Sequence, residues 1–484
     1  MPAHNTSGHA GEVVVRGGTL VDETGERRGD VLVKDGRIVA VEETIEAPKG
    51  AVVLDAAGCV VSPGLVDLHA HLREPGGEIA ETVESGSRAA ALGGYTALVA
   101  MPNTEPAIDS GAVARDVLAL GEDALAEIAV AGAITIGRRG EKLAPMAELA
   151  ALGVRLFTDD GRGVQNSGLM RRALEYASGL GVVLAEHCED LQLAAGGHMN
   201  EGPWSSRLGI AGQPVLAEEL MLARDIALVR LTGAPMHFLH LSTAGSVELV
   251  RAAKADGLAV TAEVTPHHLV LSDAAVQGYD PVFKVNPPLR SASDVAALRA
   301  GLASGVIDAV ATDHAPHAPE RKEEPFDEAP SGMLGLETAL AVAYGALCSG
   351  KGRAAADTGG SGPGGSGAEH GWVAPEKDSP MSLRDLIGAF SWKPARIAGL
   401  FAETKGGLRG GFRGGLRGGQ GGPIQPGAVA HLSVFDPSAQ WVVDVARQAS
   451  RSRNTPYAGR RLTGKVRHTV LAGEVVVLDG EAQR

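Results

Sequence analysis

Short runs of apolar residues mark both ends of the chain and are typical of β-strands. Asp35-Gly36 lies between two of these runs and is a strong signal for a hairpin turn. Because the same pattern returns near the carboxyl end, we predict one small β-sandwich built from residues 1–62 and 425–484. The expected strands are 12–16, 30–34, 37–41, 51–55, 430–436, 466–471 and 474–478.

Between these ends, from residue 63 to residue 400, strand-like runs alternate with stretches of helical periodicity. This alternation is typical of a parallel α/β fold. Candidate site residues fall at or just after strand ends, which favours a closed (β/α)8, TIM-like barrel over a doubly wound sheet. The expected strands are 95–101, 154–157, 182–186, 236–241, 259–264 and 307–312, and the expected helices are 168–180, 214–231 and 246–256.

Two glycine-rich segments interrupt the pattern. Residues 351–371 are rich in glycine and serine, and residues 401–424 contain repeats of glycine with arginine. Both compositions predict flexible insertions. The second segment is similar to arginine-glycine tracts that contact single-stranded RNA, but a solvated loop is the better interpretation.

The bulk composition narrows the function classes. A net charge of −14 argues against nucleic acid as a partner. The three cysteines, Cys59, Cys188 and Cys348, are too few and too scattered for a disulfide framework, which suits the cytoplasm. The first residues do not resemble a signal peptide, and no apolar run approaches a membrane span. We therefore expect a cytoplasmic protein with no membrane partner.

The most informative motif is the run from Asp67 to Arg73. His69 and His71 are two residues apart on a predicted strand, so their side chains point to one face and can bind the same metal ion. Arg73, two residues further on, can hold an anionic group beside that metal. The motif indicates a metal-dependent hydrolase that acts on an acidic substrate.

Further candidate ligands follow other predicted strands. A hydrolytic metal site needs several nitrogen and oxygen ligands and an open position for water. Any one of these residues is a weak signal, and a buried histidine bonded to the backbone is the commoner explanation for His187 or His240 alone. Their recurrence at successive strand ends is a far more specific signal. The candidates are Asp159 and Asp160, His187, His240 and Asp313.

Two motifs resemble the signatures of the dihydroorotase family, class I type, within the amidohydrolase superfamily. The first motif reads DLHAHLREPG at residues 67–76, and the second reads ATDHAPH at residues 311–317, with Lys322 five residues later. Outside the glycine-rich segments, the resemblance extends from about residue 12 to residue 480. It implies a metal-bearing barrel flanked by a β-sandwich.

The resemblance also implies two zinc ions per subunit. His69, His71 and Asp313 would hold the first zinc, His187 and His240 would hold the second, and Asp160 would bridge them. The choice of Asp160 over Asp159 rests on the family's Asp-Asp-Gly motif, because the sequence alone cannot separate the two.

The reaction implied is the reversible interconversion of N-carbamoyl-L-aspartate and (S)-dihydroorotate, the third step of de novo pyrimidine synthesis. Asp313 would carry the proton between the attacking water and the ring nitrogen. For Asn103 and Asn286, the alternative to substrate binding is that they form turns beside proline. Arg290 is as plausible a surface residue as a substrate ligand. The implied substrate-binding residues are His71, Arg73, Asn103, Asn286 and His317, with His267 and His268 as supporting residues.

Two other functions remain open. Hydantoinases and allantoinases resemble this chain, but most of them bridge their metals with a carboxylated lysine after the fourth strand. No lysine occurs between Lys142 and Lys254, which argues against that branch. An inactive scaffold for aspartate transcarbamoylase would have lost metal ligands, whereas all six are present. An active homo-oligomeric enzyme that also docks to that transcarbamoylase fits the sequence.

Overall fold

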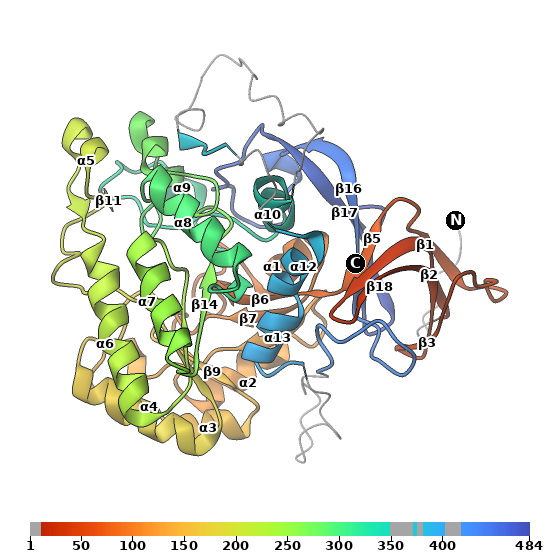
Figure 1. Ribbon diagram of the computed structural model, residues 1–484, viewed down its shortest axis with the longest axis horizontal. Coiled ribbons are helices and arrows are strands. Elements are labelled where there is room, and N and C mark those ends of the chain that lie inside the picture. The colour runs from red at the N-terminus through yellow and green to blue at the C-terminus, as the bar shows by residue number, and fades with distance from the viewer. Residues whose placement is uncertain (1–10, 349–370, 375–380, 402–417) are drawn as a thin grey trace.

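The computed structural model describes residues 11–348, 371–374, 381–401 and 418–484 (Figure 1). Strands from both ends of the chain combine in a nine-stranded sheet, in the order β19-β18-β17-β16-β5-β1-β2-β3, with β4 paired to β1. The bounds are β1 Val13–Asp22, β2 Gly25–Lys34, β3 Arg37–Glu42, β4 Val52–Asp55, β5 Val60–Pro63, β16 Leu432–Val442, β17 Arg461–Leu471, β18 Glu474–Leu478 and β19 Glu481–Ala482.

The two ends meet where β5 pairs with β16 in antiparallel register, for example Val61 with Val434. Apolar side chains from both ends, including Leu20, Val61, Val434 and Val470, form one buried cluster. Removing such side chains from water is favourable, so the amino-terminal and carboxyl-terminal strands stabilise each other. This sheet contains strands from both ends, as the hydrophobic pattern predicts.

Parallel strands occupy the middle of the chain in two sheets, β6-β7-β8 and β15-β14-β13-β10-β9. Parallel bridges join the two sheets at both ends: Gly132 pairs with Phe157, and Ala70 pairs with His314. All of these strands therefore carry their carboxyl ends in one direction. The bounds are β6 Leu65–Ala70, β7 Tyr95–Ala100, β8 Glu127–Val130, β9 Leu156–Phe157, β10 Val183–Glu186, β13 Met236–Phe238, β14 Val260–Val264 and β15 Ala309–Val310.

Helices connect these strands and pack outside them (Figure 1). Their boundaries follow local chemistry. In α4, for instance, the Asn166 side chain accepts a hydrogen bond from the Leu169 amide at the start, and Gly181 is left-handed at the end. The main helices are α1 Val83–Leu92, α2 Gly111–Leu120, α4 Ser167–Leu180, α6 Leu216–Thr232, α7 Ala244–Ala255, α8 Ala292–Ala303, α10 Ala339–Leu347 and α12 Leu383–Phe390.

Two strands end earlier than their apolar runs predict. β13 stops at Phe238 and β15 stops at Val310, although the runs continue to residues 241 and 312. Beyond these ends the backbone turns, with φ of 30° at His240 and 44° at Asp313. A positive φ cannot continue a strand and costs about 1–3 kcal/mol in a residue other than glycine. Both strained residues are candidate ligands.

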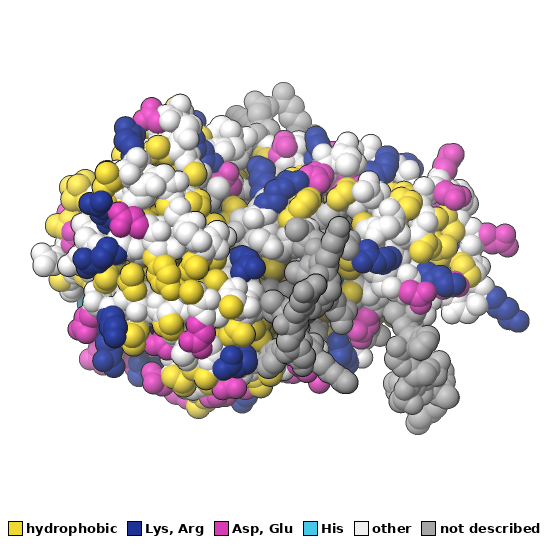
Figure 2. Space-filling model, turned by 90° about the horizontal axis from the view of Figure 1, so that it is seen from below, with side chains coloured by type: hydrophobic (Ala, Val, Ile, Leu, Met, Phe, Trp, Pro, Cys, Tyr) yellow, Lys and Arg dark blue, Asp and Glu magenta, His cyan; other side chains and the backbone are white. Residues whose placement is uncertain are grey.

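Figure 2 shows basic and acidic side chains intermixed on the face in view, without a patch of one sign. No helix in the described part of the chain is long and apolar enough to cross a membrane. Most of both glycine-rich segments, residues 351–370 and 402–417, lies outside the described residues.

Candidate metal centre and active site

The candidate ligands converge at the carboxyl ends of five parallel strands. His69 lies in β6 and His71 directly follows it, while the other four come after β9, β10, β13 and β15. Because these strands run in parallel, side chains far apart in sequence meet at one end of the fold. Each of the six is at most 6% exposed: His69, His71, Asp160, His187, His240 and Asp313.

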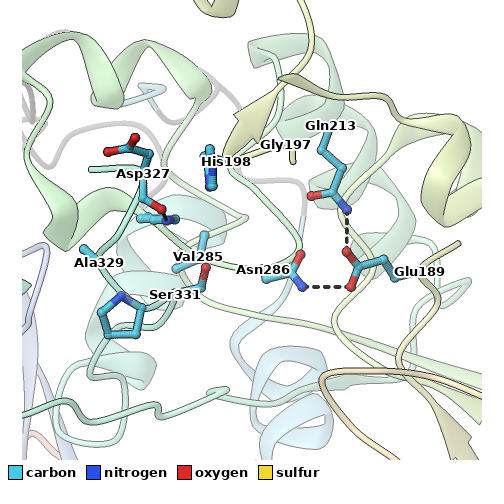
Figure 3. Close-up of a pocket in the computed structure, with 11 residues that line it drawn as sticks. Glu189, Gly197, His198, Gln213, Val285, Asn286, Asp327, Ala329 and Ser331 are labelled. Carbon is cyan, nitrogen blue, oxygen red and sulfur yellow. Dashed lines mark hydrogen bonds between the residues drawn. The ribbon is translucent and has the colours of Figure 1, made fainter. Parts of the chain in front are cut away.

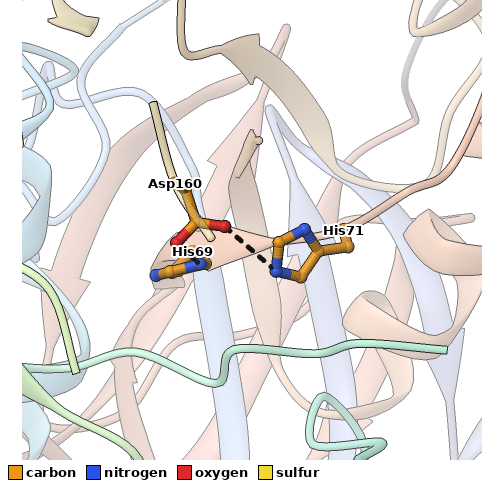
Figure 4. A group of neighbouring side chains, drawn as sticks. All are labelled: His69, His71 and Asp160. Carbon is orange, nitrogen blue, oxygen red and sulfur yellow. Dashed lines mark ion pairs between the residues drawn. The ribbon is translucent and has the colours of Figure 1, made fainter. Parts of the chain in front are cut away.

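Asp160 lies close to all four histidines of this cluster, and Figure 4 shows it beside His69 and His71. Its Oδ1 is 3.4 Å from His69 Nε2. The same oxygen is 3.6 Å from both His187 Nδ1 and His240 Nε2, and its Oδ2 is 3.7 Å from His71 Nε2. One carboxylate therefore contacts all four histidines, as a ligand shared by two ions would.

The ligand atoms fall into two groups that could each hold a metal ion. One group consists of His69, His71 and Asp160, and the other of Asp160, His187 and His240. Asp313 lies beside the first group, with its Oδ1 2.9 Å from His71 Nε2 and 3.5 Å from His69 Nε2. The structure thus brings together all six residues that the family resemblance implies as ligands.

Hydrogen bonds fix the tautomers of the first two histidines. His69 Nδ1 donates to Glu263 Oε1 at 3.0 Å, and His71 Nδ1 donates to Asn103 Oδ1 at 2.9 Å. Each Nε2 lone pair then faces carboxylate oxygens, and His69 Nε2 has no hydrogen-bond partner among the described residues. Lone pairs that face each other repel unless a cation lies between them, so this donor set fits a bound metal ion.

The second pair of histidines is arranged the other way round. His187 Nε2 donates to Glu189 Oε2 at 2.8 Å, so Nδ1 points into the cluster. That Nδ1 is 2.9 Å from His240 Nε2. Two ring nitrogens this close need a shared proton or a shared cation, and a metal ion of the second group would satisfy both.

The charges of the cluster agree with this geometry. Burial alone would raise the pKa of Asp160, but the neighbouring His69, His187 and His240 hold it well below its ordinary value. The carboxylates attract a proton as they would attract a metal ion: burial would lower the pKa of His187, but Asp160 and Glu189 raise it to about 10. Neighbouring histidines also lower the pKa of Asp313 against the effect of burial. The buried carboxylates are ionised and attract positive charge.

Asp159 points away from the cluster. Its Oδ1 accepts hydrogen bonds from the backbone amides of Ile134 and Thr135 at 2.9 and 3.0 Å, and its Oδ2 accepts one from the Thr135 hydroxyl. It belongs to neither ligand group. Asp159 therefore shapes the turn after β8, and Asp160 alone of the two faces the histidines.

The implied substrate residues surround the same centre. Arg73 is partly buried, and its Nε donates to the Pro316 carbonyl at 3.1 Å. Burial lowers the pKa of Arg73 to about 10, so it remains a cation at neutral pH. His317 Nε2 donates to the Ser331 carbonyl at 2.7 Å. Asn103 uses its amide oxygen to hold His71, which leaves its amide nitrogen to donate.

Asn286 lines a polar pocket of about 260 Å³ (Figure 3). Its Nδ2 donates to Glu189 Oε2 at 2.9 Å, and Gln213 Nε2 donates to Glu189 Oε1 at 3.2 Å. Lys284 and Ser331 also line this pocket. Asn286 therefore connects the pocket to the Glu189–His187 pair.

Other motif residues hold loops. Lys322 is buried and donates to the carbonyls of Pro281, Lys284 and Pro330. His268 Nε2 donates to the Pro287 carbonyl at 3.1 Å, next to Asn286. Arg290 is 1% exposed and donates hydrogen bonds to Ser242 and Asn200. It is therefore a buried residue that joins loops, and not a surface residue. His267 is buried near the cluster.

Glu189 and Glu263, which orient His187 and His69, are not among the residues predicted from the sequence. A weak signal for Glu189 was its position two residues after His187. Glu263 is a single acidic residue within an otherwise apolar strand-like run. A charge in such a run is costly to bury unless it is paired, and that could have marked it.

Comparisons with known proteins identify the family that the chain resembles. A model of the family described as dihydro-orotase-like matches residues 58–246. Dihydroorotases of Anaeromyxobacter dehalogenans and Mycobacterium bovis are each 45% identical to this chain, over 475 and 473 residues, covering 97% of it and 99% of the relative. The dihydroorotase of Pelotomaculum thermopropionicum is 44% identical over 470 residues, with the same coverage.

Solved structures resemble the fold at lower identity. The dihydropyrimidinase of Brevibacillus agri has a TM-score of 0.75 at 22% identity and covers 98% of this chain and 96% of its own. The L-hydantoinase of Arthrobacter aurescens has a TM-score of 0.75 at 24% identity, covering 98% and 97%. At such identities the likeness shows the fold alone.

Proposed function

The chain belongs to the dihydroorotase family of cyclic amide hydrolases, and we propose that it interconverts N-carbamoyl-L-aspartate and (S)-dihydroorotate at the centre around Asp160. The observation that carries this is the pair of ligand groups that share one carboxylate, with Asp313 beside the first. This reaction is the third step of pyrimidine synthesis and takes place in the cytoplasm.

The metal ions of this centre are two zinc ions per subunit. His69, His71 and Asp313 would hold the first, His187 and His240 would hold the second, and Asp160 would be shared by both. Imidazole and carboxylate are ligands that zinc accepts in catalytic sites. When bound, the metals lower the pKa of water and polarise the amide carbonyl.

Asp313 moves the proton. Its ionised carboxylate, 2.9 Å from His71, accepts a proton from the attacking water and passes it to the leaving ring nitrogen. In the biosynthetic direction, Asp313 takes the proton from the carbamoyl nitrogen that closes the ring. One residue can serve both directions because its carboxylate accepts a proton in one step and donates that proton in the next.

Arg73, Asn103 and His317 bind the substrate carboxylate that does not react. Arg73 is the only one of the three with a permanent positive charge, and its planar guanidinium matches a carboxylate with two parallel hydrogen bonds. Asn286 would contact the ring, and His71 would contact the substrate as well as the first metal ion. The substrate is thereby held by its charge at one end and by its reacting amide at the other.

The fold that presents this centre is a closed (β/α)8 barrel spanning residues 63–400, with a β-sandwich from residues 1–62 and 425–484. The two bridges that join the parallel sheets at both ends support closure. The enzyme is a homo-oligomer and docks to aspartate transcarbamoylase. Light scattering of the protein alone, and then with the transcarbamoylase, tests the last two statements.

Arg73→Lys is expected to lower kcat/KM for dihydroorotate by about 10- to 100-fold, mainly through KM. An ammonium cannot reproduce the two parallel hydrogen bonds of a guanidinium, and a hydrogen bond to a charged group contributes about 1.5–3 kcal/mol. Steady-state kinetics measure the change. Arg171→Lys, at an exposed position of α4, is the matched control and should behave as wild type. Wild-type kinetics for Arg73→Lys would remove it from the substrate site.

The proposed function is tested by measuring zinc content and turnover of dihydroorotate on the same preparation. Hydantoin and allantoin serve as control substrates, because related hydrolases of this fold act on such rings. About two zinc ions per subunit and turnover of dihydroorotate alone support the proposal. Protein without zinc, or with turnover only of the control substrates, contradicts it.

A further inference from the structure

Glu263 lies beneath the candidate metal centre, on β14, and is fully buried. Its Oε1 accepts a hydrogen bond from His69 Nδ1 at 3.0 Å. The same oxygen lies 3.4 Å from the backbone amide of His240, which donates to it. Glu263 therefore contacts one ligand from each of the two groups, although it belongs to neither.

A second histidine holds the other carboxylate oxygen. His237 Nε2 donates to Glu263 Oε2 at 3.0 Å, and the Thr261 hydroxyl donates to His237 Nδ1 at 2.8 Å. His237 and Thr261 are paired across β13 and β14. Thr261 therefore donates to His237 and His237 donates to Glu263, while His69 donates to Glu263 from the other side, so the one carboxylate accepts from both histidines.

These hydrogen bonds determine which nitrogen of His69 faces the metals. With its proton on Nδ1 and donated to Glu263, the ring presents Nε2 as a lone pair toward Asp160 and Asp313. The contact to the His240 amide acts on the second group, because His240 adopts a φ of 30° that a strand does not support. A partner for that amide holds the strained turn in place.

We propose that Glu263, held by His237, is the positioning residue of the whole centre and orients a ligand of each metal ion through a single carboxylate oxygen. The inference rests on the proposed two-metal function. It predicts that loss of the Glu263 charge weakens both metal sites together, although no metal ligand is changed. Carboxylates that orient metal-binding histidines typically contribute 10- to 100-fold to metal affinity or activity.

The test compares Glu263→Gln with wild type after removal of the metals by a chelator. Zinc affinity is measured by competition with a chromophoric chelator, and the visible spectrum of the cobalt(II) form reports the ligand geometry. Glu263→Gln should bind zinc about 10- to 100-fold more weakly at both sites and alter the cobalt spectrum. With zinc saturating, kcat should fall while KM for dihydroorotate stays near wild type, because Glu263 contacts no substrate residue.

Two further variants make the result decisive. Asp22→Asn removes a buried carboxylate in the nine-stranded sheet and should leave zinc affinity and spectrum unchanged. Thr261→Val removes only the hydrogen bond from the Thr261 hydroxyl to His237. It should weaken zinc binding about two- to tenfold, the effect of one hydrogen bond. If Glu263→Gln does not fold, as judged by circular dichroism of the metal-free protein, Thr261→Val decides the question.

Wild-type zinc affinity and cobalt spectrum in Glu263→Gln, or in Thr261→Val where it decides, would overturn the role of Glu263. That outcome differs from failure of the proposed function, in which wild-type protein itself binds no zinc. A defect confined to one metal site would also overturn the inference, because the structure connects Glu263 to both groups.

Discussion

Replacing Asp313 by asparagine is expected to lower kcat by about 10²- to 10⁴-fold, the usual contribution of general acid–base catalysis. Asparagine keeps the shape of the side chain but cannot accept a proton from water. The effect should appear in both directions of the reaction, because the same carboxylate serves each. Rates with dihydroorotate and with N-carbamoyl-L-aspartate measure it.

Zinc content must be measured alongside these rates, since Asp313 is also a proposed ligand. Asp308→Asn is the matched control: Asp308 lies just before the start of β15, pairs with Lys254 and contacts no member of the cluster. Its turnover should remain near wild type. A loss below tenfold in Asp313→Asn that retains zinc would show that another group moves the proton.

Asp160→Ala should reduce zinc from about two ions per subunit to less than one, whereas Asp159→Ala should keep most of its zinc. Asp160 contacts all four histidines, and Asp159 accepts hydrogen bonds from the turn after β8. The two variants remove the same charge from adjacent positions, so each is the control for the other. Elemental analysis after metal reconstitution measures the difference.

Asp159→Ala should instead lower the thermal midpoint, because it leaves the amides of Ile134 and Thr135 without their acceptor. Reconstitution should not depend on added bicarbonate, because an aspartate needs no carbon dioxide to become a ligand. A metal-poor Asp159→Ala would reverse the assignment of the two aspartates. Unchanged zinc in both variants would exclude β9 as a source of ligands.

Part of the centre could be predicted because strand geometry is regular. Side chains two residues apart on a strand share a face, so the spacing of His69 and His71 alone predicted that they converge. The same rule could not separate Asp159 from Asp160. β9 has only two residues, and both aspartates lie beyond it, where the turn and its contacts to Ile134 determine which side chain points inward.

The partners that orient the ligands could not be predicted, because they come from distant parts of the chain. Glu263 is 194 residues away from His69, and pairing between them depends on the order of strands in the sheet. The burial of Arg290 similarly depends on Asn200, which lies 90 residues earlier in the chain. Local periodicity carries no information about such contacts. It does predict the strands that precede the ligands, although not the residues at which β13 and β15 end.

The nine-stranded sheet has a consequence for how the molecule is made on the ribosome. β5 and β1 emerge early, but β16 and β17 follow more than 360 residues later, and until then the β5 edge that pairs with β16 is open. An open edge beside apolar side chains such as Val61 is a template for pairing with other chains. The nascent protein must therefore protect that edge throughout synthesis of its catalytic portion, and chains that terminate before β16 should be prone to aggregation.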